Sequence, residues 1–146
     1  MRRALTAAAI AVVAAAVWLA AAPPAAMRQP IAFPHAKHQA VACVVCHRGA
    51  ETAARAGIPD GAFCAKCHST LPREIAWVQV TRIPPHVMFS HRRHVALARL
   101  DCASCHGEMR DRRAPVDTAA TALTMTNCLS CHRHEGAAED CAACHR

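Results

Sequence analysis

The sequence predicts a small, mostly irregular fold with short α-helices, preceded by an N-terminal hydrophobic helix and wrapped around bound groups rather than its own side chains. Three observations support this prediction. The motif Cys-x-x-Cys-His occurs five times and uses all ten cysteines. The chain is 53% hydrophobic, yet it has three Phe, two Trp and no Tyr, so it lacks the large side chains that ordinarily fill a core. An uncharged run from Ala4 to Ala22 follows two arginines.

Each of the five motifs places two cysteines three residues apart and a histidine directly after the second. Two such thiols add to the two vinyl groups of one haem, and the histidine reaches the iron beneath the ring. The pattern therefore predicts five covalently bound haem c groups. The predicted attachment residues are Cys43, Cys46, Cys64, Cys67, Cys102, Cys105, Cys128, Cys131, Cys141 and Cys144, and the predicted proximal ligands are His47, His68, His106, His132 and His145.

Two other uses of paired cysteines agree less well with the pattern. A tetrahedral zinc site joins two Cys-x-x-Cys pairs and does not require a histidine after each pair. Five pairs also do not divide into four-cysteine sites. A redox disulfide enzyme carries one or two active pairs within a thioredoxin-like βαβ pattern, which this sequence does not show. The motifs favour haem over both.

The formal net charge of +7 does not indicate nucleic-acid binding. Each haem adds about −2 from its propionates and about +1 from a ferric centre, so five haems bring the protein close to neutrality. Aromatic residues are not interleaved with the basic ones, as they are in single-strand binders. We interpret six arginines as propionate partners or as a solvated face: Arg92, Arg93, Arg99, Arg110, Arg112 and Arg113.

Residues 1–26 are predicted to be a signal-anchor or a signal peptide, because a positive start, an apolar run and small residues follow one another. The apolar run is long enough to span a bilayer core of about 30 Å. Pro23 directly after the small-residue site disfavours cleavage, so an uncleaved anchor is favoured over a soluble periplasmic form. The arginines stay in the cytoplasm by the positive-inside rule, which places the haems on the periplasmic side of the cytoplasmic membrane.

The remainder of the chain contains an internal repeat. Phe-x-His-x-x-His occurs at 33–38 and again at 89–94, and two haem motifs follow each copy. We therefore predict one pentahaem cytochrome c domain over 27–146, with di-haem modules at about 31–72 and 86–133 and a fifth haem at 134–146. The three-residue spacing places both histidines of a copy on one side of a helical turn, from which they can reach different irons.

Six histidines lie outside the motifs, and five irons with two histidine ligands each need five of them. The predicted distal ligands are His35, His38, His91 and His94 from the repeat, with His86 as the fifth. His134 is the alternative to His86, but its position two residues beyond a proximal ligand disfavours it. Three methionines, Met88, Met109 and Met125, are alternative axial ligands, although hydrophobic packing is their more common role.

The repeat followed by serial Cys-x-x-Cys-His motifs resembles the cytochrome c3 family, the class III multihaem cytochromes with their c7-type members. A closer likeness runs through 56–59, 75–80, 84–91 and 123–125. These segments are similar to the pentahaem subunit of alternative complex III-type quinol oxidoreductases and to cytochromes that accompany iron–sulfur molybdoenzymes. The resemblance covers residues 31–146 and departs from the pattern between the last two motifs, which are crowded. It implies a class III-like fold, electron transfer at the membrane surface, and subunits of such complexes as partners.

The residues also predict an electron-transfer protein rather than an enzyme. Irons with two histidine ligands have no open site for a substrate, and no acid/base pair, nucleophile motif or phosphate loop stands out. The predicted function is electron transfer on the outer face of the cytoplasmic membrane, as a subunit or partner of a quinol-oxidising respiratory complex. The alternatives are a multihaem reductase with one open-coordination haem and a haem-based redox sensor.

Overall fold

The computed structural model describes residues 27–146, so the anchor or signal segment predicted at 1–26 lies outside the described residues. Short helices joined by irregular chain make up the described part. In chain order these are η1 (His35–His38), α2 (Cys43–Cys46), α3 (Gly61–Cys64), η2 (Arg93–Leu97), α4 (Ala103–His106), η3 (Met109–Asp111), α5 (Met125–Glu135) and α6 (Cys141–Cys144). Over 27–146 no strand forms, and one isolated bridge joins Val87 to His145. The predicted fold class, small and mostly irregular with short helices, is confirmed.

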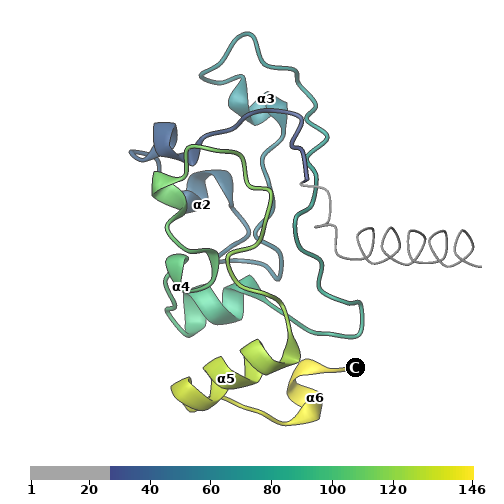
Figure 1. The fold of residues 1–146 in the computed structure, drawn as a ribbon. Helices are drawn as coiled ribbons and strands as arrows, with labels where there is room; N and C mark the ends of the chain where they lie inside the picture. Colours follow the sequence, from purple (N-terminus) through teal and green to yellow (C-terminus); the bar gives the residue numbers. More distant parts are fainter. Residues whose placement is uncertain (1–26) are drawn as a thin grey trace, which may run out of the picture.

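The helices are distributed along an elongated body. Figure 1 shows α3 at one end, α2 and α4 along the middle, and α5 with α6 at the other end beside the C-terminus. The η1 and η3 helices pack against each other, and the amide of Ala36 donates to the carbonyl oxygen of Arg112. Within the described residues, no helix has the length and apolar character needed to cross a membrane.

Side-chain burial contributes little to this part of the molecule. Ala50 is the only fully buried hydrophobic residue of 27–146. Many larger apolar side chains are exposed instead, among them Val41, Val45, Ile58, Val78, Met88, Leu97, Leu123 and Met125. A chain of this size ordinarily folds by burying such side chains. The described residues leave this apolar surface for another group to cover.

Polar contacts between distant segments hold the irregular chain in place. The Gln29 amide donates to the carbonyl oxygens of Val78 and Val116, and its own oxygen accepts from the Val78 amide. The indole nitrogen of Trp77 donates to the carbonyl oxygen of Pro59 at 2.9 Å. The backbone groups in these bonds lie in irregular segments, where no helix or sheet provides them with a hydrogen-bond partner. They position the 75–80 segment beside the loop that precedes α3.

Helix caps define where the short helices begin. The Asp60 carboxylate accepts from the Phe63 amide at the start of α3, and the Asp140 carboxylate accepts from the Ala143 amide at the start of α6. Thr124 caps α5 in the same way through its hydroxyl. Such caps satisfy amides that have no partner inside the helix and contribute about 1 kcal/mol each. They fix the start of the turns that carry three of the five motifs.

Gly61 begins α3 where this helix contacts the chain after the second motif. A Cβ atom at Gly61 would collide with the carbonyl oxygen of Pro72 and would lie 2.8 Å from the carbonyl group of Arg73. Because backbone atoms cannot rotate away, only glycine fits. Gly136 differs, since it ends α5 in the left-handed conformation with φ of 64° and has open space around its missing Cβ.

We expect Gly61→Ala to lower the free energy of unfolding by about 1–3 kcal/mol, the usual cost of forcing atoms into a packed site. Gly136→Ala is the matched control and should cost about 1 kcal/mol, because it adds only the strain of a left-handed alanine. Denaturant unfolding of the haem-loaded proteins, followed by far-UV circular dichroism, measures both changes. A Gly61→Ala protein as stable as the wild type would contradict this contact.

Candidate haem-binding sites

The five Cys-x-x-Cys-His motifs lie on short helical turns. Four of them lie on α2, α4, α5 and α6, and the second begins at the last residue of α3 and continues as a turn. Residues three and four positions apart share one side of a helical turn. The two thiols and the histidine of a motif can therefore approach a flat group from the same direction. Each of the ten cysteines is exposed or half-buried.

Four motif histidines each face a histidine from outside the motifs. The ring centroids are 6.1 Å apart for His38 and His68, 6.3 Å for His91 and His106, 6.2 Å for His94 and His132, and 5.7 Å for His86 and His145. Two imidazoles that bind opposite sides of one metal ion, each at a nitrogen–metal distance of about 2 Å, have ring centroids about 6 Å apart. The facing rings are therefore spaced as the two axial ligands of one iron.

His35, the remaining histidine of the repeat, has the histidine of the first motif as an electrostatic neighbour. Burial lowers the pKa of His35 below its usual value, and the nearby imidazoles of His47 and His38 lower this pKa further. The Nδ1 atom of His35 is buried and has no hydrogen-bond partner in the described chain. A lowered pKa favours the neutral imidazole, which is the form that binds a metal.

Backbone carbonyl oxygens orient several of these rings. The Nδ1 atom of His47 lies 2.7 Å from the carbonyl oxygen of Gly57. In the second copy of the repeat, His94 makes the same contact to Ser90 at 2.8 Å, and His38 makes the equivalent contact in the first copy. A carbonyl oxygen can only accept, so Nδ1 must donate its hydrogen and Nε2 keeps its lone pair. This arrangement leaves Nε2 free to bind a metal.

A phenylalanine precedes each histidine pair of the repeat and packs against both rings. Phe33 lies edge-on to His35, with ring centroids 4.9 Å apart, and stacks on His38 at 4.6 Å. Phe89 repeats this arrangement with the two histidines of the second copy, at 5.0 Å and 4.6 Å. Sequence reasoning identified the phenylalanines as part of the repeat but assigned them no role. The signal in the sequence for such a role is that a phenylalanine stands at the same position ahead of both histidine pairs.

His134 is the sixth histidine outside the motifs, and it does not join a pair of facing rings. Its side chain is 83% exposed, and its Nδ1 atom lies 3.2 Å from a carboxylate oxygen of Glu135. His86 instead stacks on His145, with an angle of 15° between the ring planes. The structure thus brings the histidine favoured as the fifth distal ligand to a motif histidine and leaves the alternative at the surface.

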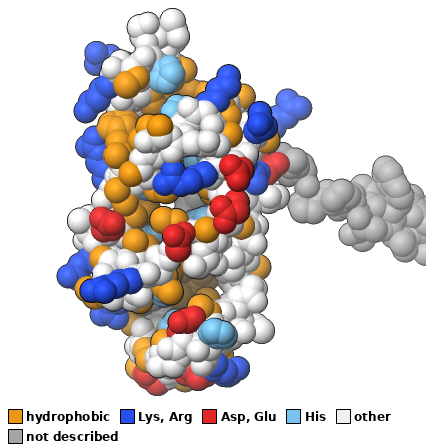
Figure 2. All heavy atoms as spheres, turned by 90° about the vertical axis from the view of Figure 1, so that its left-hand side faces the viewer, with side chains coloured by type: hydrophobic (Ala, Val, Ile, Leu, Met, Phe, Trp, Pro, Cys, Tyr) orange, Lys and Arg blue, Asp and Glu red, His pale blue; other side chains and the backbone are white. Residues whose placement is uncertain are grey.

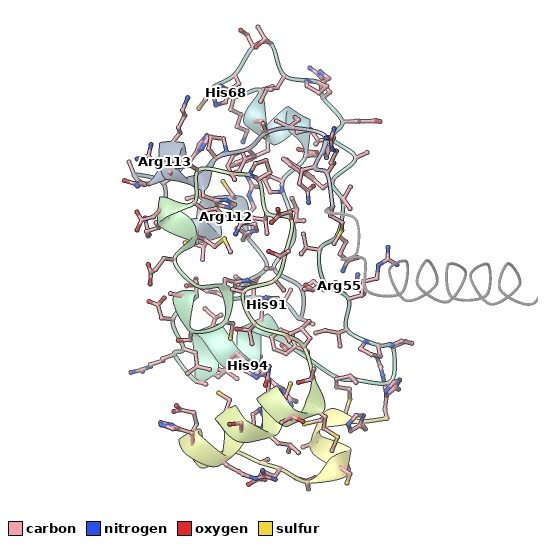
Figure 3. All side chains as sticks on the ribbon, viewed as in Figure 1. Arg55, His68, His91, His94, Arg112 and Arg113 are labelled. Carbon is pink, nitrogen blue, oxygen red and sulfur yellow. The ribbon has the colours of Figure 1, made fainter. Side chains whose placement is uncertain are left out.

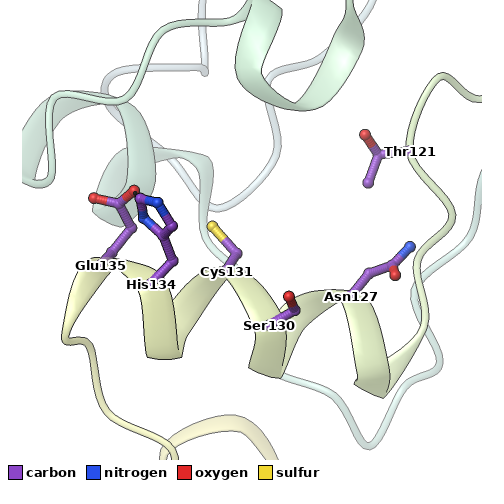
Figure 4. A pocket seen from close by; sticks show the side chains of 6 residues that line it. All are labelled: Thr121, Asn127, Ser130, Cys131, His134 and Glu135. Atoms are coloured by element: carbon purple, nitrogen blue, oxygen red, sulfur yellow. Dashed lines mark hydrogen bonds and ion pairs between the residues drawn. The ribbon is translucent and has the colours of Figure 1, made fainter.

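A groove lies along α5 beside the fourth motif. Its volume is about 430 Å³, and its lining residues are Thr121, Asn127, Ser130, Cys131, His134 and Glu135. Figure 4 shows Asn127, Ser130, Cys131, His134 and Glu135 on α5, with the sulfur of Cys131 directed away from the helix, and Thr121 apart from them on the segment before α5. A motif thiol that opens into a groove is accessible to a covalently attached group.

The residues present fit a haem better than a bare metal ion. The described part of the chain gathers no group of three or more His, Cys, Asp and Glu side chains that could hold a metal ion. A haem iron carries four nitrogen ligands of its own ring and needs only two from the protein, which facing histidines supply. Exposed apolar side chains such as Val45, Leu97 and Met125 offer surface that a porphyrin would cover.

The basic side chains are dispersed over the surface. Figure 2 shows lysines and arginines spread across the visible face, with hydrophobic side chains between them. Two of the six arginines expected to be propionate partners or a solvated face have protein partners. Arg112 forms an ion pair with Asp117 at 2.6 Å, and Arg110 donates to the carbonyl oxygen of Gln39. The absence of one continuous basic patch on this face agrees with a solvated face.

Comparisons with known proteins match both halves of the chain. A model described as "Class III cytochrome C family" matches residues 12–80, and one described as "Cytochrome c7 and related cytochrome c" matches residues 87–146. A curated relative is named "Menaquinone reductase, multiheme cytochrome c subunit" and comes from Nitratidesulfovibrio vulgaris. It is 32% identical over 99 residues, which cover 53% of this chain and 45% of the relative. The chain therefore spans less than half the length of that relative.

Both family models describe cytochromes with covalently bound haem c, and together they include all five motifs. The short helices, the small amount of buried apolar side chain and the facing histidines agree with such a protein. Residues 12–80 thus match the class III cytochromes c and residues 87–146 the c7-type cytochromes c, which are families of electron-transfer proteins, and the chain is similar to a relative named as the cytochrome subunit of a menaquinone reductase.

Proposed function

We propose that the chain binds five haem c groups, each held by one Cys-x-x-Cys pair and by two histidines. The observation that carries this proposal is that four of the five motif histidines each face a different histidine from elsewhere in the chain, while the fifth, His47, has His35 as an electrostatic neighbour. In motif order the proposed axial pairs are His47 with His35, His68 with His38, His106 with His91, His132 with His94, and His145 with His86.

The proposed pairs support the predicted modules. The first two pairs lie within 31–72, and the third and fourth lie within 86–133. The fifth pair joins His86, at the start of the second module, to the last motif. The amide of Arg146 donates to the carbonyl oxygen of His86, and Met88 donates to Cys144, so backbone bonds accompany this pairing. We propose the fifth motif as an addition tied back to the second module.

This arrangement suits a carrier of electrons. When bound, each haem supplies an iron that accepts and releases one electron. The cysteines would hold the group covalently, and the two histidines of each site would bind its iron, which would leave no coordination site for a substrate. A multihaem reductase would need one site with a single histidine, and the five proposed pairs leave no such site. We therefore favour the carrier over the reductase.

We further propose that the chain works on the periplasmic face of the cytoplasmic membrane and exchanges electrons with a membrane quinone or quinol oxidoreductase, or with a related molybdoenzyme-type complex. Two observations support this. The relative from Nitratidesulfovibrio vulgaris is named as a subunit of a menaquinone reductase. The apolar run that follows the first arginines has the order of an export segment.

The intact mass of the mature protein should exceed that of the polypeptide by about 5 × 616 Da, because every motif offers both thiols and the histidine. Mass spectrometry of the protein under denaturing conditions retains covalent haem and measures this difference. A mass that fits three or four haems would show that one of the motifs is not used.

Replacing His86 should open one axial position, because its ring faces His145. We expect His86→Ala to produce a high-spin signal in electron paramagnetic resonance and to let about one haem in five bind carbon monoxide after reduction. His134→Ala is the matched control and should change neither property, since His134 is exposed and contacts Glu135.

Two outcomes would contradict these assignments. A high-spin signal in His134→Ala together with an unchanged His86→Ala would exchange the roles of the two histidines. A high-spin haem in the unmodified protein would favour the multihaem reductase. Because the cysteines attach the haem, neither variant should alter the intact mass by more than the substitution itself.

The location is tested by cell fractionation. An uncleaved anchor should make the protein sediment with membranes and keep its original amino terminus, because Pro23 disfavours cleavage and the apolar run can span a bilayer. Amino-terminal sequencing of the membrane fraction gives the result. Recovery of a soluble periplasmic form that begins near Met27 would identify residues 1–26 as a cleaved signal peptide.

A further inference from the structure

We propose that the two predicted modules position each other's distal histidines. The loop after the first motif, at 49–56, holds the second copy of the repeat, and the segment after the third motif, at 107–113, holds the first copy. This inference rests on the proposed haem binding and deepens it, because it assigns the residues that orient distal ligands to the opposite module.

Two backbone hydrogen bonds of equal length join the modules. The amide of Arg92, directly after the first histidine of the second copy, donates to the carbonyl oxygen of Ala53 at 3.0 Å. The amide of Ala36, at the same position in the first copy, donates to the carbonyl oxygen of Arg112 at 3.0 Å. Ala53 follows the first motif at the same interval at which Arg112 follows the third motif. The two bonds are therefore equivalent under the repeat, and each crosses from one module to the other.

Both donating amides lie at the start of a short helix. Ala36 is the second residue of η1, and Arg92 is the residue directly before η2. Amides at the start of a helix have no partner within that helix, so another segment or water must accept from them. Because the chain is duplicated, each copy of the repeat offers such an amide and each module offers a loop carbonyl oxygen. Exchange of these bonds between the modules satisfies both amides.

In the second copy, the 49–56 loop also orients the ligand itself. The carbonyl oxygen of Ala54 accepts from the His91 amide at 3.0 Å and lies 3.1 Å from Nδ1 of the His91 ring. Because a carbonyl oxygen can only accept, Nδ1 donates its hydrogen and Nε2 keeps the lone pair that binds a metal. One oxygen of the first module thus holds both the backbone and the ring of the ligand proposed for the third site.

The loop after the first motif has internal contacts that keep this oxygen in place. The amide of Gly49 donates to the carbonyl oxygen of Ala56 at 2.9 Å, and the amide of Ala53 donates to the carbonyl oxygen of Gly49 at 2.8 Å. Ala50, the only fully buried hydrophobic residue of the described chain, lies within this loop. A Cβ atom at Gly49 would collide with the carbonyl oxygen of Arg55, so only glycine allows the loop to close in this way.

The first copy is held by a different set of additional contacts. The guanidinium group of Arg110 donates to the carbonyl oxygen of Gln39 at 2.6 Å, and the Gln39 side-chain amide donates to the carbonyl oxygen of Arg110 at 3.3 Å. The second copy has Val95 at the position of Gln39, so it cannot form the side-chain bond. Nδ1 of His35, in turn, is buried and has no acceptor in the described chain. The ring of His91, unlike that of His35, therefore has its acceptor in the other module.

These contacts lie along the middle of the elongated body. Figure 3 shows Arg112 above His91, with Arg55 of the 49–56 loop at about the level of His91. Figure 1 shows the purple turn of η1 beside the green turn of η3, and these two helices pack against each other. Neither module can move away from the other without breaking bonds that hold the distal ligands of both.

Amide hydrogen exchange in the fully reduced, haem-loaded protein, followed by NMR, tests the contacts in both directions. We expect the amides of Ala36, His91 and Arg92 to exchange slowly, because each donates to a carbonyl oxygen of the other module. Without these bonds, amides at the start of such short helices would exchange quickly. Fast exchange of all three amides in the unmodified protein would overturn the proposal.

Gly49→Ala should act on the opposite module. By displacing the loop, this substitution should speed exchange of the His91 amide and leave exchange of the Ala36 amide unchanged. An imidazole that loses its carbonyl acceptor is a weaker donor to ferric iron, so the reduction potential of the third haem should rise. Redox titration followed by NMR measures this potential, once each haem is assigned through contacts with its own cysteines.

Arg110→Ala tests the contacts in the other direction. It removes the side-chain bond to the carbonyl oxygen of Gln39, so exchange should become faster at the Ala36 amide and stay unchanged at the His91 amide. Each of the two variants thus controls for the other, because each should loosen one copy of the repeat and spare the second copy.

Gly136→Ala is the matched control for the glycine substitution. It strains the chain after the fourth motif, where the missing Cβ has open space, and should alter neither amide. A Gly49→Ala protein with the His91 exchange rate and the third-haem potential of the wild type would overturn the proposal. Should Gly49→Ala fail to load haem, the exchange rates of the unmodified protein still decide.

These experiments separate the contacts between modules from the proposed binding. The number of haem methyl signals counts the haems, and their assigned ligand contacts test the histidine pairs, whichever residues orient them. Five haems with the expected ligands and unprotected amides would leave the proposed binding intact and refute the mutual positioning. Fewer haems, or different ligands, would refute the binding itself.

Discussion

Each site joins a helical motif to a histidine that comes from another part of the chain, and the fold depends on this pairing. Closing a loop between distant residues costs entropy, which rises slowly with loop length. Ordering the backbone costs about 1–2 kcal/mol per residue. Buried side chains cannot offset this cost here, since Ala50 is the only fully buried hydrophobic residue of the described chain. In the proposed holoprotein, thioether and imidazole bonds take the role that disulfides and metals have in other small domains.

The irregular backbone is part of how the sites are built. A carbonyl oxygen inside a helix or sheet is already bonded to an amide, whereas one in a loop is free to accept from an imidazole. The oxygens of Ala54, Gly57 and Ala138 lie in loops and accept from the rings of His91, His47 and His132. More regular structure at these positions would remove the acceptors that set which ring nitrogen faces the metal. The shortage of helix and sheet therefore contributes to the chemistry of the sites.

Local features of the sites could be predicted from the sequence, and long-range ones could not. The motif spacing predicts thiols and histidine on one side of a turn, and α2, α4, α5 and α6 carry four motifs in this way. The spacing within 33–38 likewise predicts two histidines on one turn, as in η1. The partner of each histidine depends on segments far apart in sequence, such as His86 and His145. The close approach of Gly61 to the backbone of residues 72–73 could not be predicted either, because no local sequence pattern encodes it.

The two copies of the repeat show how a duplicated sequence produces unequal sites. Stacking on phenylalanine is nearly the same in both copies, with ring planes 23° apart for Phe33 and His38 and 24° apart for Phe89 and His94. The facing histidines differ, because the angle between their ring planes is 60° at the second motif, 3° at the third, 42° at the fourth and 15° at the fifth. Local sequence sets the orientation of one ring, and the path of the rest of the chain sets the other. Ligand orientation, hydrogen bonding and exposure tune a haem, so sites with the same two ligands need not be equivalent. Duplication thus supplies the ligands, and the long-range fold makes each site distinct.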